Sequence, residues 1–314
     1  MEGVRRERAG ENKLFLRNFF CKKKIMASTG VYIRKIRVEG LWGVYDLEWE
    51  LGSEVNILAG SNGSGKSTIL RCLSDMFTTG SIAPSHRGRL RRLTVEFTDG
   101  TAVGSEAAFD PSVYHISVVN TFDTMLQESE AVYKLSDGSV ATYLDWELYK
   151  LQNRYLAYQL EVGKEVIAAL QAGRKTEEVQ GLTDRKVLFF NTIDALLEAT
   201  GKRIDRDSDT LQFKTRYGMT IRPHQLSSGE KQVLIILTSV LVQSGRPFIM
   251  IMDEPEISLH FEWQRRLIED VRRLNPHLQL IVATHSPAVV MNGWTDRVTE
   301  MSDIVRTDES KTEK

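Results

Sequence analysis

Residues Gly60 to Ser67 read Gly-Ser-Asn-Gly-Ser-Gly-Lys-Ser and have the spacing of a GxxxxGK[ST] phosphate-binding loop. In such a loop the glycines let backbone N–H groups curl around phosphates, and the N-terminus of the following helix adds positive charge. We expect Lys66 to reach the β and γ phosphates of a nucleotide and the Ser67 hydroxyl to ligate Mg²⁺. The predicted nucleotide-binding residues are Gly60, Ser61, Asn62, Gly63, Ser64, Gly65, Lys66, Ser67 and Thr68.

Two carboxylates, Asp253 and Glu254, follow the apolar run Phe248 to Met252. A fully apolar run of this length is typical of a buried parallel strand, which delivers the residues after it to the carboxyl edge of the sheet. We expect Asp253 to hold Mg²⁺, directly or through water, and Glu254 to polarise an attacking water as general base. Acidic residues are common after strands, so the pair indicates a nucleotide site only because a phosphate loop precedes it in the sequence.

A third candidate group opens an apolar helical pattern and consists of Ser227, Ser228, Gly229 and Glu230. Serine hydroxyls and free N–H groups at a helix start form a second phosphate-binding surface. An ordinary N-cap is the alternative, with Ser227 or Ser228 capping and Glu230 completing the first turn. The position of the segment shortly before the Asp-Glu strand favours phosphate binding.

Strands and helices alternate along most of the chain and would bring these groups together. Period-two alternation or short apolar runs predict strands at 31–38, 47–51, 55–59, 93–97, 113–122, 211–214, 219–222, 248–252 and 278–283. Apolar residues at helical spacing predict helices from Ser67 onwards and over 233–241 and 263–274. This order argues for an α/β phosphate-loop fold with a mixed, largely parallel sheet.

Composition divides the chain into five segments. Between two halves of a nucleotide-binding domain we expect a helical insertion, rich in Leu, Glu, Lys and Gln, which either packs on itself or offers a partner site. The basic start is interpreted as a mobile extension or an early start codon, with Met26 as the alternative start. The charged tail is expected to be disordered. The boundaries are 1–30 for the extension, 31–125 and 206–303 for the two halves, 126–205 for the insertion and 304–314 for the tail.

The bulk composition limits the classes of partner and the cellular location that we expect for this protein. Forty-one basic and 42 acidic residues give a formal net charge of −1, so any nucleic-acid contact requires a local patch. The two cysteines, Cys21 and Cys72, lack metal-ligand spacing, and a reducing cytoplasm is the expected location. No apolar run approaches the roughly 18 residues of a membrane span, and we predict neither a signal peptide nor a membrane partner.

The order of these motifs resembles that of the ABC-type ATPases. The loop Gly60–Ser67, the segment Leu226–Gln232 and Asp253-Glu254-Pro255 are similar to the phosphate loop, signature motif and Walker B strand; Ser258-Leu259-His260 and Ala283-Thr284-His285-Ser286 are similar to the D-loop and switch histidine. The resemblance covers roughly residues 31–300, less the insertion. The variant Asp-Glu-Pro-Glu-Ile-Ser-Leu-His is closer to the soluble branch, which includes SMC- and RecF-like repair ATPases, OLD ATPases and AAA ATPases of anti-phage systems such as Septu.

This resemblance implies ATP and Mg²⁺ as cofactors and a head-to-tail homodimer or higher oligomer. Each ATP would lie on the phosphate loop of one subunit and be closed by the other subunit's Ser227, Ser228, Gly229 and Glu230. His285 would contact the γ-phosphate and report its loss. A lone His after a strand is usually structural, but the Thr-His-Ser context favours the switch role.

Several departures from the family pattern refine this expectation. Ser228 replaces the second signature glycine, which weakens a transporter interpretation. The insertion is far too short for the coiled-coil arm of an SMC protein. The stretch after His285 has no room for the TOPRIM nuclease domain of OLD proteins, so any nuclease is expected on another chain. The glutamine-loop position is open between Asp123 and Gln127.

The leading hypothesis is an ATPase subunit of a defence system that controls a separately encoded effector such as a nuclease, by analogy with the family. The first alternative is a DNA-repair ATPase that contacts DNA or RNA through Arg87, Arg89, Arg91 and Arg92, although such runs are also common on solvated faces. The second is a nucleotide-sensing scaffold with negligible turnover. Glu254 argues against that scaffold, since a sensor has little need of a general base.

Overall fold

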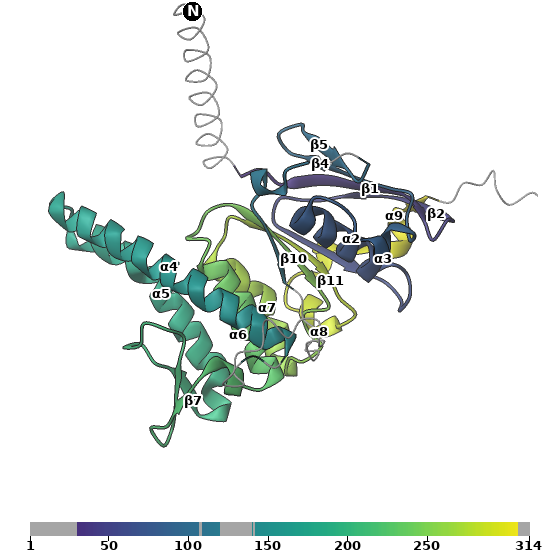
Figure 1. The fold of residues 1–314 in the computed structure, drawn as a ribbon. Coiled ribbons are helices and arrows are strands. Elements are labelled where there is room, and N and C mark those ends of the chain that lie inside the picture. Colours follow the sequence, from purple (N-terminus) through teal and green to yellow (C-terminus); the bar gives the residue numbers. More distant parts are fainter. Residues whose placement is uncertain (1–29, 107–108, 120–139, 141, 307–314) are drawn as a thin grey trace, which may run out of the picture.

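The computed structural model describes residues 30–106, 109–119, 140 and 142–306. Within these ranges the chain forms two five-stranded sheets and a three-stranded sheet, with helices around them. Figure 1 shows helix α2 (Lys66–Thr79) beside the N-terminal strands and a long helical hairpin projecting from the opposite side of the molecule. The predicted α/β fold is confirmed, and its parallel and antiparallel strands are divided between separate sheets.

The antiparallel sheet has the strand order β13-β2-β1-β4-β5. Its strands are β1 (Ile33–Leu41), β2 (Tyr45–Glu50), β4 (Arg92–Phe97), β5 (Ala102–Gly104) and β13 (Val305–Arg306). Ile36 pairs with Trp49 and Val38 with Leu47, and all four side chains are buried. One face of this sheet is therefore apolar, and the intervening charged residues lie on the other face.

The central sheet is entirely parallel, with the order β12-β3-β11-β10-β6. Its strands are β3 (Val55–Ala59), β6 (Ile116–Val119), β10 (Phe248–Asp253), β11 (Leu278–Ala283) and β12 (Val298–Glu300). All residues of β11 and all but the last residue of β10 are buried. Burial on both faces explains why these strands read as continuous apolar runs.

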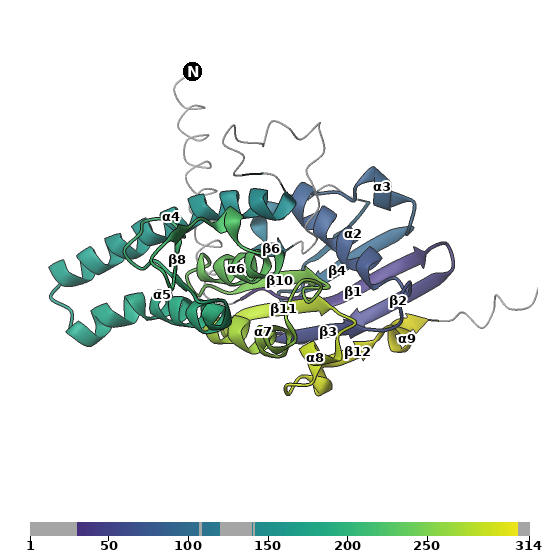
Figure 2. The same ribbon diagram turned by 90° about the horizontal axis from the view of Figure 1, so that it is seen from below.

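Helices cover both faces of the central sheet (Figure 2). α2 lies between the two large sheets, where Ile69, Leu70 and Leu73 share one core with Ile36 and Ile251. The other face is covered by α6 (Ser228–Leu241) and α7 (Phe261–Leu274), in a second core. The shorter helices are α3 (Pro84–Arg87), α8 (Pro287–Val290) and α9 (Met301–Ile304).

The projecting hairpin consists of α4 (Tyr143–Gln171) and α5 (Thr176–Leu197). α4 begins at a capping box in which Thr142 and Asp145 satisfy each other's backbone N–H groups. A small antiparallel sheet follows, formed by β7 (Lys202–Ile204), β8 (Phe213–Thr215) and β9 (Thr220–Ile221). Because β7 pairs with β8, this lobe continues across the predicted boundary at residue 205.

Two further sequence expectations differ from the structure or lie outside it. Val305 and Arg306, assigned to the disordered tail, form β13, because their backbone pairs with Leu47 and Asp46 of β2. The predicted extension up to residue 29, residues 120–139 of the predicted strand and insertion, and residues 307–314 lie outside the described residues. Among the residues that the structure describes, no helix is long and apolar enough to cross a membrane.

Candidate functional site

The phosphate loop connects β3 to α2 at the carboxyl edge of the parallel sheet. Gly65, at the N-cap of α2, has φ +106°, a conformation that L side chains rarely adopt. A Cβ at this position would also lie 2.9 Å from Leu41 Cδ2. Glycine is therefore required here both by the backbone and by the contact with β1, and the free N–H groups of α2 open toward the loop.

The Lys66 side chain folds back into the loop and is only 3% exposed. Its Nζ donates to the carbonyl oxygens of Gly60 at 2.8 Å and Ser61 at 3.0 Å, and to Ser64 Oγ at 3.4 Å. Burial lowers the pKa of Lys66, and the nearby carboxylates of Glu254 and Asp253 partly offset this. An ammonium held by neutral carbonyls in a glycine loop is well placed to exchange them for phosphate oxygens.

The pair expected to hold a metal ion lies next to the loop. Ser67 Oγ donates to Asp253 Oδ1 at 2.8 Å, and Arg71 Nε lies 3.5 Å from Asp253 Oδ2. Burial raises the pKa of Asp253, and the hydrogen bond from Ser67 and the Arg71 charge oppose that rise. A hydroxyl and a carboxylate at this separation are the hard oxygen donors that Mg²⁺ prefers, and Mg²⁺ takes its remaining ligands from water and phosphate.

Glu254 directly follows β10 in a left-handed backbone conformation with φ +48°. Its N–H donates to the Ala283 carbonyl oxygen at 2.8 Å, which fixes it against the end of β11. Its Oε1 lies 3.2 Å from His285 Nε2. A non-glycine residue in this conformation costs about 1 kcal/mol or more, and such strain is concentrated at functional sites. Glu254 lines the same cavity as the phosphate loop.

These side chains meet in one cavity, which combines four separate segments of the sequence. Its lining consists of Trp42, Asn62, Gly63, Gly65, Lys66, Ser67, Thr68, Glu254 and His285. Six of the nine predicted nucleotide-binding residues belong to this lining. Gly60, Ser61 and Ser64 instead contact the Lys66 ammonium. Asp123 and Gln127, the candidates for the glutamine loop, lie outside the described residues.

Sequence reasoning missed Trp42. It lies in the turn between β1 and β2 with φ +53°, is 42% exposed, and its N–H donates to the Arg89 carbonyl oxygen at 2.7 Å. The signal was a tryptophan between Gly40 and Gly43, where a turn is expected and a large apolar side chain has no core to join. A half-exposed indole beside a phosphate loop is suited to stack on a planar ring such as a nucleobase.

Contacts within the same chain hold the signature segment, residues 227–230, in place. Ser227 is the N-cap of α6, and its hydroxyl and the Glu230 carboxylate form a capping box. Ser227 and Ser228 are exposed, whereas Gly229 is buried. A Cβ at Gly229 would lie 2.3 Å from the Ser258 carbonyl oxygen, so no larger residue fits there. None of Ser227, Ser228, Gly229 or Glu230 lines the cavity at the phosphate loop.

Glu230 differs from the other three signature residues. Its side chain is 2% exposed, and Lys202 Nζ donates to both of its carboxylate oxygens at 2.8 Å. Thr200 Oγ1 donates to the same carboxylate at 2.9 Å. The assignment of Glu230 to a nucleotide-contacting surface therefore requires correction: its carboxylate is occupied by residues of its own chain and ties the start of α6 to β7. The neighbouring Lys231 forms a second buried ion pair, at 2.8 Å, with Asp145 of α4.

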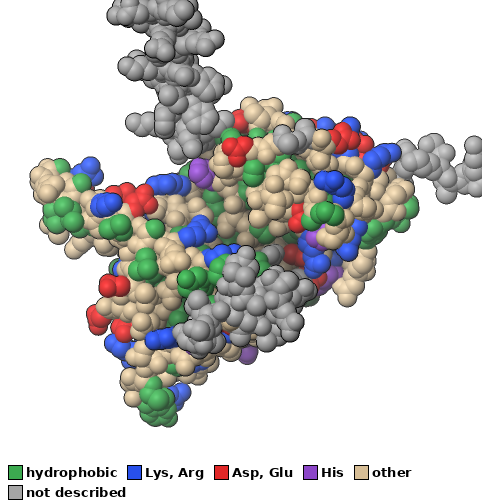
Figure 3. Space-filling view, in the orientation of Figure 1, with side chains coloured by type: hydrophobic (Ala, Val, Ile, Leu, Met, Phe, Trp, Pro, Cys, Tyr) green, Lys and Arg blue, Asp and Glu red, His purple; other side chains and the backbone are tan. Residues whose placement is uncertain are grey.

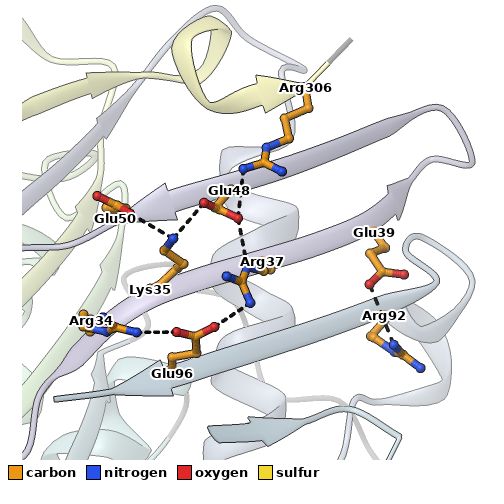
Figure 4. Close-up of polar contacts among 9 residues, drawn as sticks. All are labelled: Arg34, Lys35, Arg37, Glu39, Glu48, Glu50, Arg92, Glu96 and Arg306. Carbon is orange, nitrogen blue, oxygen red and sulfur yellow. Dashed lines mark hydrogen bonds and ion pairs between the residues drawn. The ribbon is translucent and has the colours of Figure 1, made fainter. Parts of the chain in front are cut away.

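The arginines considered for nucleic-acid contact lie on α3, on β4 and in the segment between them. Arg91 and Arg92 lie 3.6 and 3.8 Å from the Glu39 carboxylate, so part of their charge is compensated within the chain. The same compensation extends across the outer face of the antiparallel sheet (Figure 4). The α4–α5 hairpin also carries charges of both signs on the face shown in Figure 3.

The residues of this outer face form a charge ladder, defined here as Arg34, Lys35, Arg37, Glu48, Glu50, Glu96 and Arg306 (Figure 4). Lys35 Nζ and Arg37 Nε each lie 2.8 Å from a Glu48 oxygen. Hydrogen bonds from Lys35 and then Arg37 lower the pKa of Glu48 to about 2. In the ladder, therefore, carboxylates are stabilised in their charged form by cross-strand partners.

Comparisons with known proteins agree with this geometry. The family model described as "AAA domain, putative AbiEii toxin, Type IV TA system" matches residues 114–292, more than half of the chain. The Septu protein PtuA of Bacillus thuringiensis is 22% identical over 300 residues, which span 82% of this chain and 72% of that protein. An uncharacterized ABC transporter ATP-binding protein of Haemophilus influenzae is 42% identical over 65 residues, but these span only 24% of that protein.

Among solved structures, an SMC head bound to the C-terminal winged-helix domain of ScpA is similar to the chain with a TM-score of 0.47 and 13% identity, over 83% of this chain and 92% of that one. The predicted resemblance to ABC- and SMC-type ATPases of the Septu-like branch is confirmed by the family match and by the similarity to PtuA. The matched region contains the signature segment, Asp253, Glu254 and His285, each in the structural position described above. The chain therefore belongs to this AAA-domain family.

Proposed function

We propose that this protein is an ATP-binding and ATP-hydrolysing subunit that closes as a head-to-tail dimer around ATP and controls a separately encoded effector. The observation that carries the proposal is the convergence of Lys66, Ser67, Glu254 and His285 on one cavity, with Asp253 bonded to Ser67 at its edge. Phosphate binding, metal binding and water activation each have a suitable side chain there.

Within the cavity the roles follow from chemistry and position. Lys66 exchanges its loop carbonyls for the β and γ phosphates, to which a cation binds more strongly. Ser67 and Asp253 hold Mg²⁺, which supplies neutralising charge on the phosphates when it is bound. Glu254 orients and deprotonates the attacking water, and His285, 3.2 Å from Glu254, contacts the γ-phosphate and registers its departure.

The dimer is proposed because the two phosphate-binding surfaces of one chain do not meet. Ser227 and Ser228 are exposed at the N-terminus of the 14-residue helix α6 and do not line the chain's own cavity. A helix start with exposed hydroxyls attracts phosphate. A second copy that presents this surface to the first copy's ATP completes both sites, and the symmetry of two such contacts closes the assembly.

We propose that the dimer acts in bacterial anti-phage defence, which the family match and the similarity to PtuA support, and that it acts in the cytoplasm. ATP closure orders or sequesters the effector, such as a nuclease, and hydrolysis or nucleotide loss releases it. The charge compensation around Arg91 and Arg92 gives no preference to a nucleic-acid-repair role.

A turnover assay tests the enzymatic part of the proposal. Phosphate release from Mg·ATP is measured for the wild type and for Glu254→Gln, with Glu96→Gln on the charge ladder as the matched control. Loss of the general base is expected to lower kcat about 10²–10⁴-fold while ATP still binds, and the control is expected to keep wild-type turnover. Undiminished turnover in Glu254→Gln would show that another residue is the general base. Absence of turnover in the wild type would favour the nucleotide-sensing scaffold.

A further inference from the structure

Glu256 lies two residues beyond Glu254 and is 7% exposed, although it does not line the cavity. Its Oε1 accepts three hydrogen bonds from the turn that carries the switch histidine. Thr284 Oγ1 donates at 2.5 Å, His285 N at 3.1 Å and Ser286 N at 3.3 Å. One carboxylate oxygen thus accepts hydrogen bonds from one side-chain hydroxyl and two consecutive backbone N–H groups.

The second oxygen of Glu256 has a different environment. Oε2 is buried and has no hydrogen-bond partner among the described residues. Burying a carboxylate is costly, and the cost is tolerated where charge-assisted hydrogen bonds offset it. Since all three donors bond Oε1, a single acceptor oxygen in this position is sufficient to hold the turn.

The turn is held from a second direction by α7. Ser286 Oγ donates to Gln264 Oε1 at 2.7 Å, and Gln264 Nε2 donates to the Leu259 carbonyl oxygen at 2.9 Å. The segment that carries Glu256 is therefore connected to the histidine turn both directly and through Gln264. The backbone of His285 therefore cannot shift relative to this segment without breaking several of these bonds.

The same segment is fixed on its other side by the signature helix. Gln232, which is fully buried, donates from Nε2 to the Pro255 carbonyl oxygen at 2.5 Å. Gly229 packs against the Ser258 carbonyl so closely that no side chain fits between them. The stretch from Pro255 to Leu259 is thus held between the start of α6 and the turn of His285.

We propose that Glu256 is a positioning residue, which places His285 opposite Glu254 and links that placement to the start of α6 in the same subunit. The inference rests on the proposed role of His285 in hydrolysis and adds the means by which movement at the signature helix reaches the histidine. Glu256 acts through its hydrogen bonds to the turn of His285 and does not itself line the cavity.

Hydrogen exchange tests the positioning without any need for turnover. Amide exchange of His285 and Ser286 is measured in the nucleotide-free full-length protein for the wild type, Glu256→Ala and Glu256→Gln. Glu256→Ala is expected to raise the exchange rate of His285 about tenfold or more, because its N–H loses its acceptor. The rate of Ser286 is expected to rise less, because its N–H also donates to Thr284 Oγ1 at 2.9 Å. Glu256→Gln keeps an acceptor oxygen and is expected to stay within about threefold of the wild type. Unchanged exchange in Glu256→Ala would overturn the proposal.

Steady-state kinetics test the consequence for catalysis. Glu256→Ala is expected to lower kcat about tenfold or more with KM changed less than about threefold, and Glu256→Gln is expected to restore most of kcat. Asp270→Ala, which removes another buried carboxylate from α7, controls for general destabilisation and is expected to leave the kcat-to-KM pattern unchanged. A Glu256→Gln variant as inactive as Glu256→Ala would mean that the charge itself is required, which contradicts a purely positioning role.

Two further comparisons distinguish failure of the Glu256 proposal from misfolding of a variant and from failure of the proposed function. If Glu256→Ala fails to fold, Thr284→Val is used instead, since it changes the volume little. It removes the bond from Thr284 Oγ1 to Glu256 and one acceptor of the Ser286 N–H, and it is expected to raise exchange at this turn and lower kcat by less than Glu256→Ala. If the wild type shows no turnover, the proposed function fails, while the exchange measurement still decides whether Glu256 holds the turn. If Glu256→Gln and Thr284→Val both keep wild-type exchange rates and Thr284→Val also keeps wild-type kcat, the comparison of Glu256→Ala with the wild type decides. A Glu256→Ala variant with wild-type kcat would then overturn the proposal.

Discussion

The charge ladder and the catalytic edge, the name used here for the proposed catalytic residues Lys66, Ser67, Asp253, Glu254 and His285, both concentrate carboxylates and cations. The two regions differ in how these charges are satisfied. In the ladder, Glu48 lies between Lys35 and Arg37, and its pKa falls to about 2. At the catalytic edge burial dominates, so that the pKa of Asp253 is raised and that of Lys66 is lowered. The ladder satisfies its charges within the chain, whereas the edge holds charges that favour a ligand.

Backbone conformation shows the same difference. The ladder residues lie on strands, with cross-strand pairs such as Lys35 opposite Glu50, and none of them has a positive φ. Glu254, in contrast, has φ +48° although glutamate rarely adopts that conformation. Ligand binding and catalysis use strain and buried charge that a purely structural region avoids. Three experiments test this difference between the two regions.

The largest effect is expected from removing a cation at each region. Lys66→Ala should weaken ATP binding roughly 100-fold, because a charge-assisted contact to phosphate is lost from a buried site. Lys35→Ala, in the ladder, should leave ATP affinity unchanged. Binding is measured with a fluorescent ATP analogue in the presence of Mg²⁺. Wild-type affinity in Lys66→Ala would show that the phosphate loop is assigned wrongly.

An intermediate effect is expected from relieving the backbone strain. Glu254→Gly should stabilise the nucleotide-free protein by about 1 kcal/mol, because glycine adopts positive φ without a Cβ penalty. Glu178→Gly, in the regular helix α5, should destabilise it by about the same amount. Thermal unfolding of the two variants would contradict the account if both moved in the same direction.

The smallest effect is expected from the ladder and depends on pH. The folded-state pKa of Glu48, about 2, lies below its ordinary value of 4.5, so its ion pairs stabilise the fold above pH 4.5 and lose this effect as the pH falls toward 2. Glu48→Gln should therefore be less stable than the wild type at pH 7, by about 1 kcal/mol or less, and equally stable near pH 2. Urea unfolding at several pH values measures this, and a stability difference independent of pH would contradict the ion-pair explanation.

The parts of the fold that the sequence predicted are those encoded locally. The strand 55–59, the loop ending at Lys66 and Ser67, and the buried strand before Asp253 are each defined by contiguous residues, and the structure has them at those positions. The predicted strand 31–38 corresponds to β1, which has a register irregularity between Ile33 and Lys35 where it pairs with β4. Local pattern is sufficient where every residue of the motif belongs to one segment.

Pairings between distant segments were beyond sequence reasoning. The Glu230 carboxylate is held by Lys202, 28 positions away, so the local motif alone gave no sign that it is buried. No local motif singles out Glu256, because its hydrogen-bond partners are residues 284–286, 28 to 30 positions away. The short strand β13 exists only because β2 offers it an edge. Tertiary contacts decide such cases.

The central claim is that ATP joins two copies through the signature segment, and the molar mass of Glu254→Gln tests it most directly. Light scattering is carried out with and without Mg·ATP, with Ser228→Arg in the same background as the control. We expect ATP to convert a smaller species to one of twice its mass, and Ser228→Arg to prevent this conversion. A mass that does not respond to ATP, or a conversion that Ser228→Arg leaves intact, would contradict the proposed dimer.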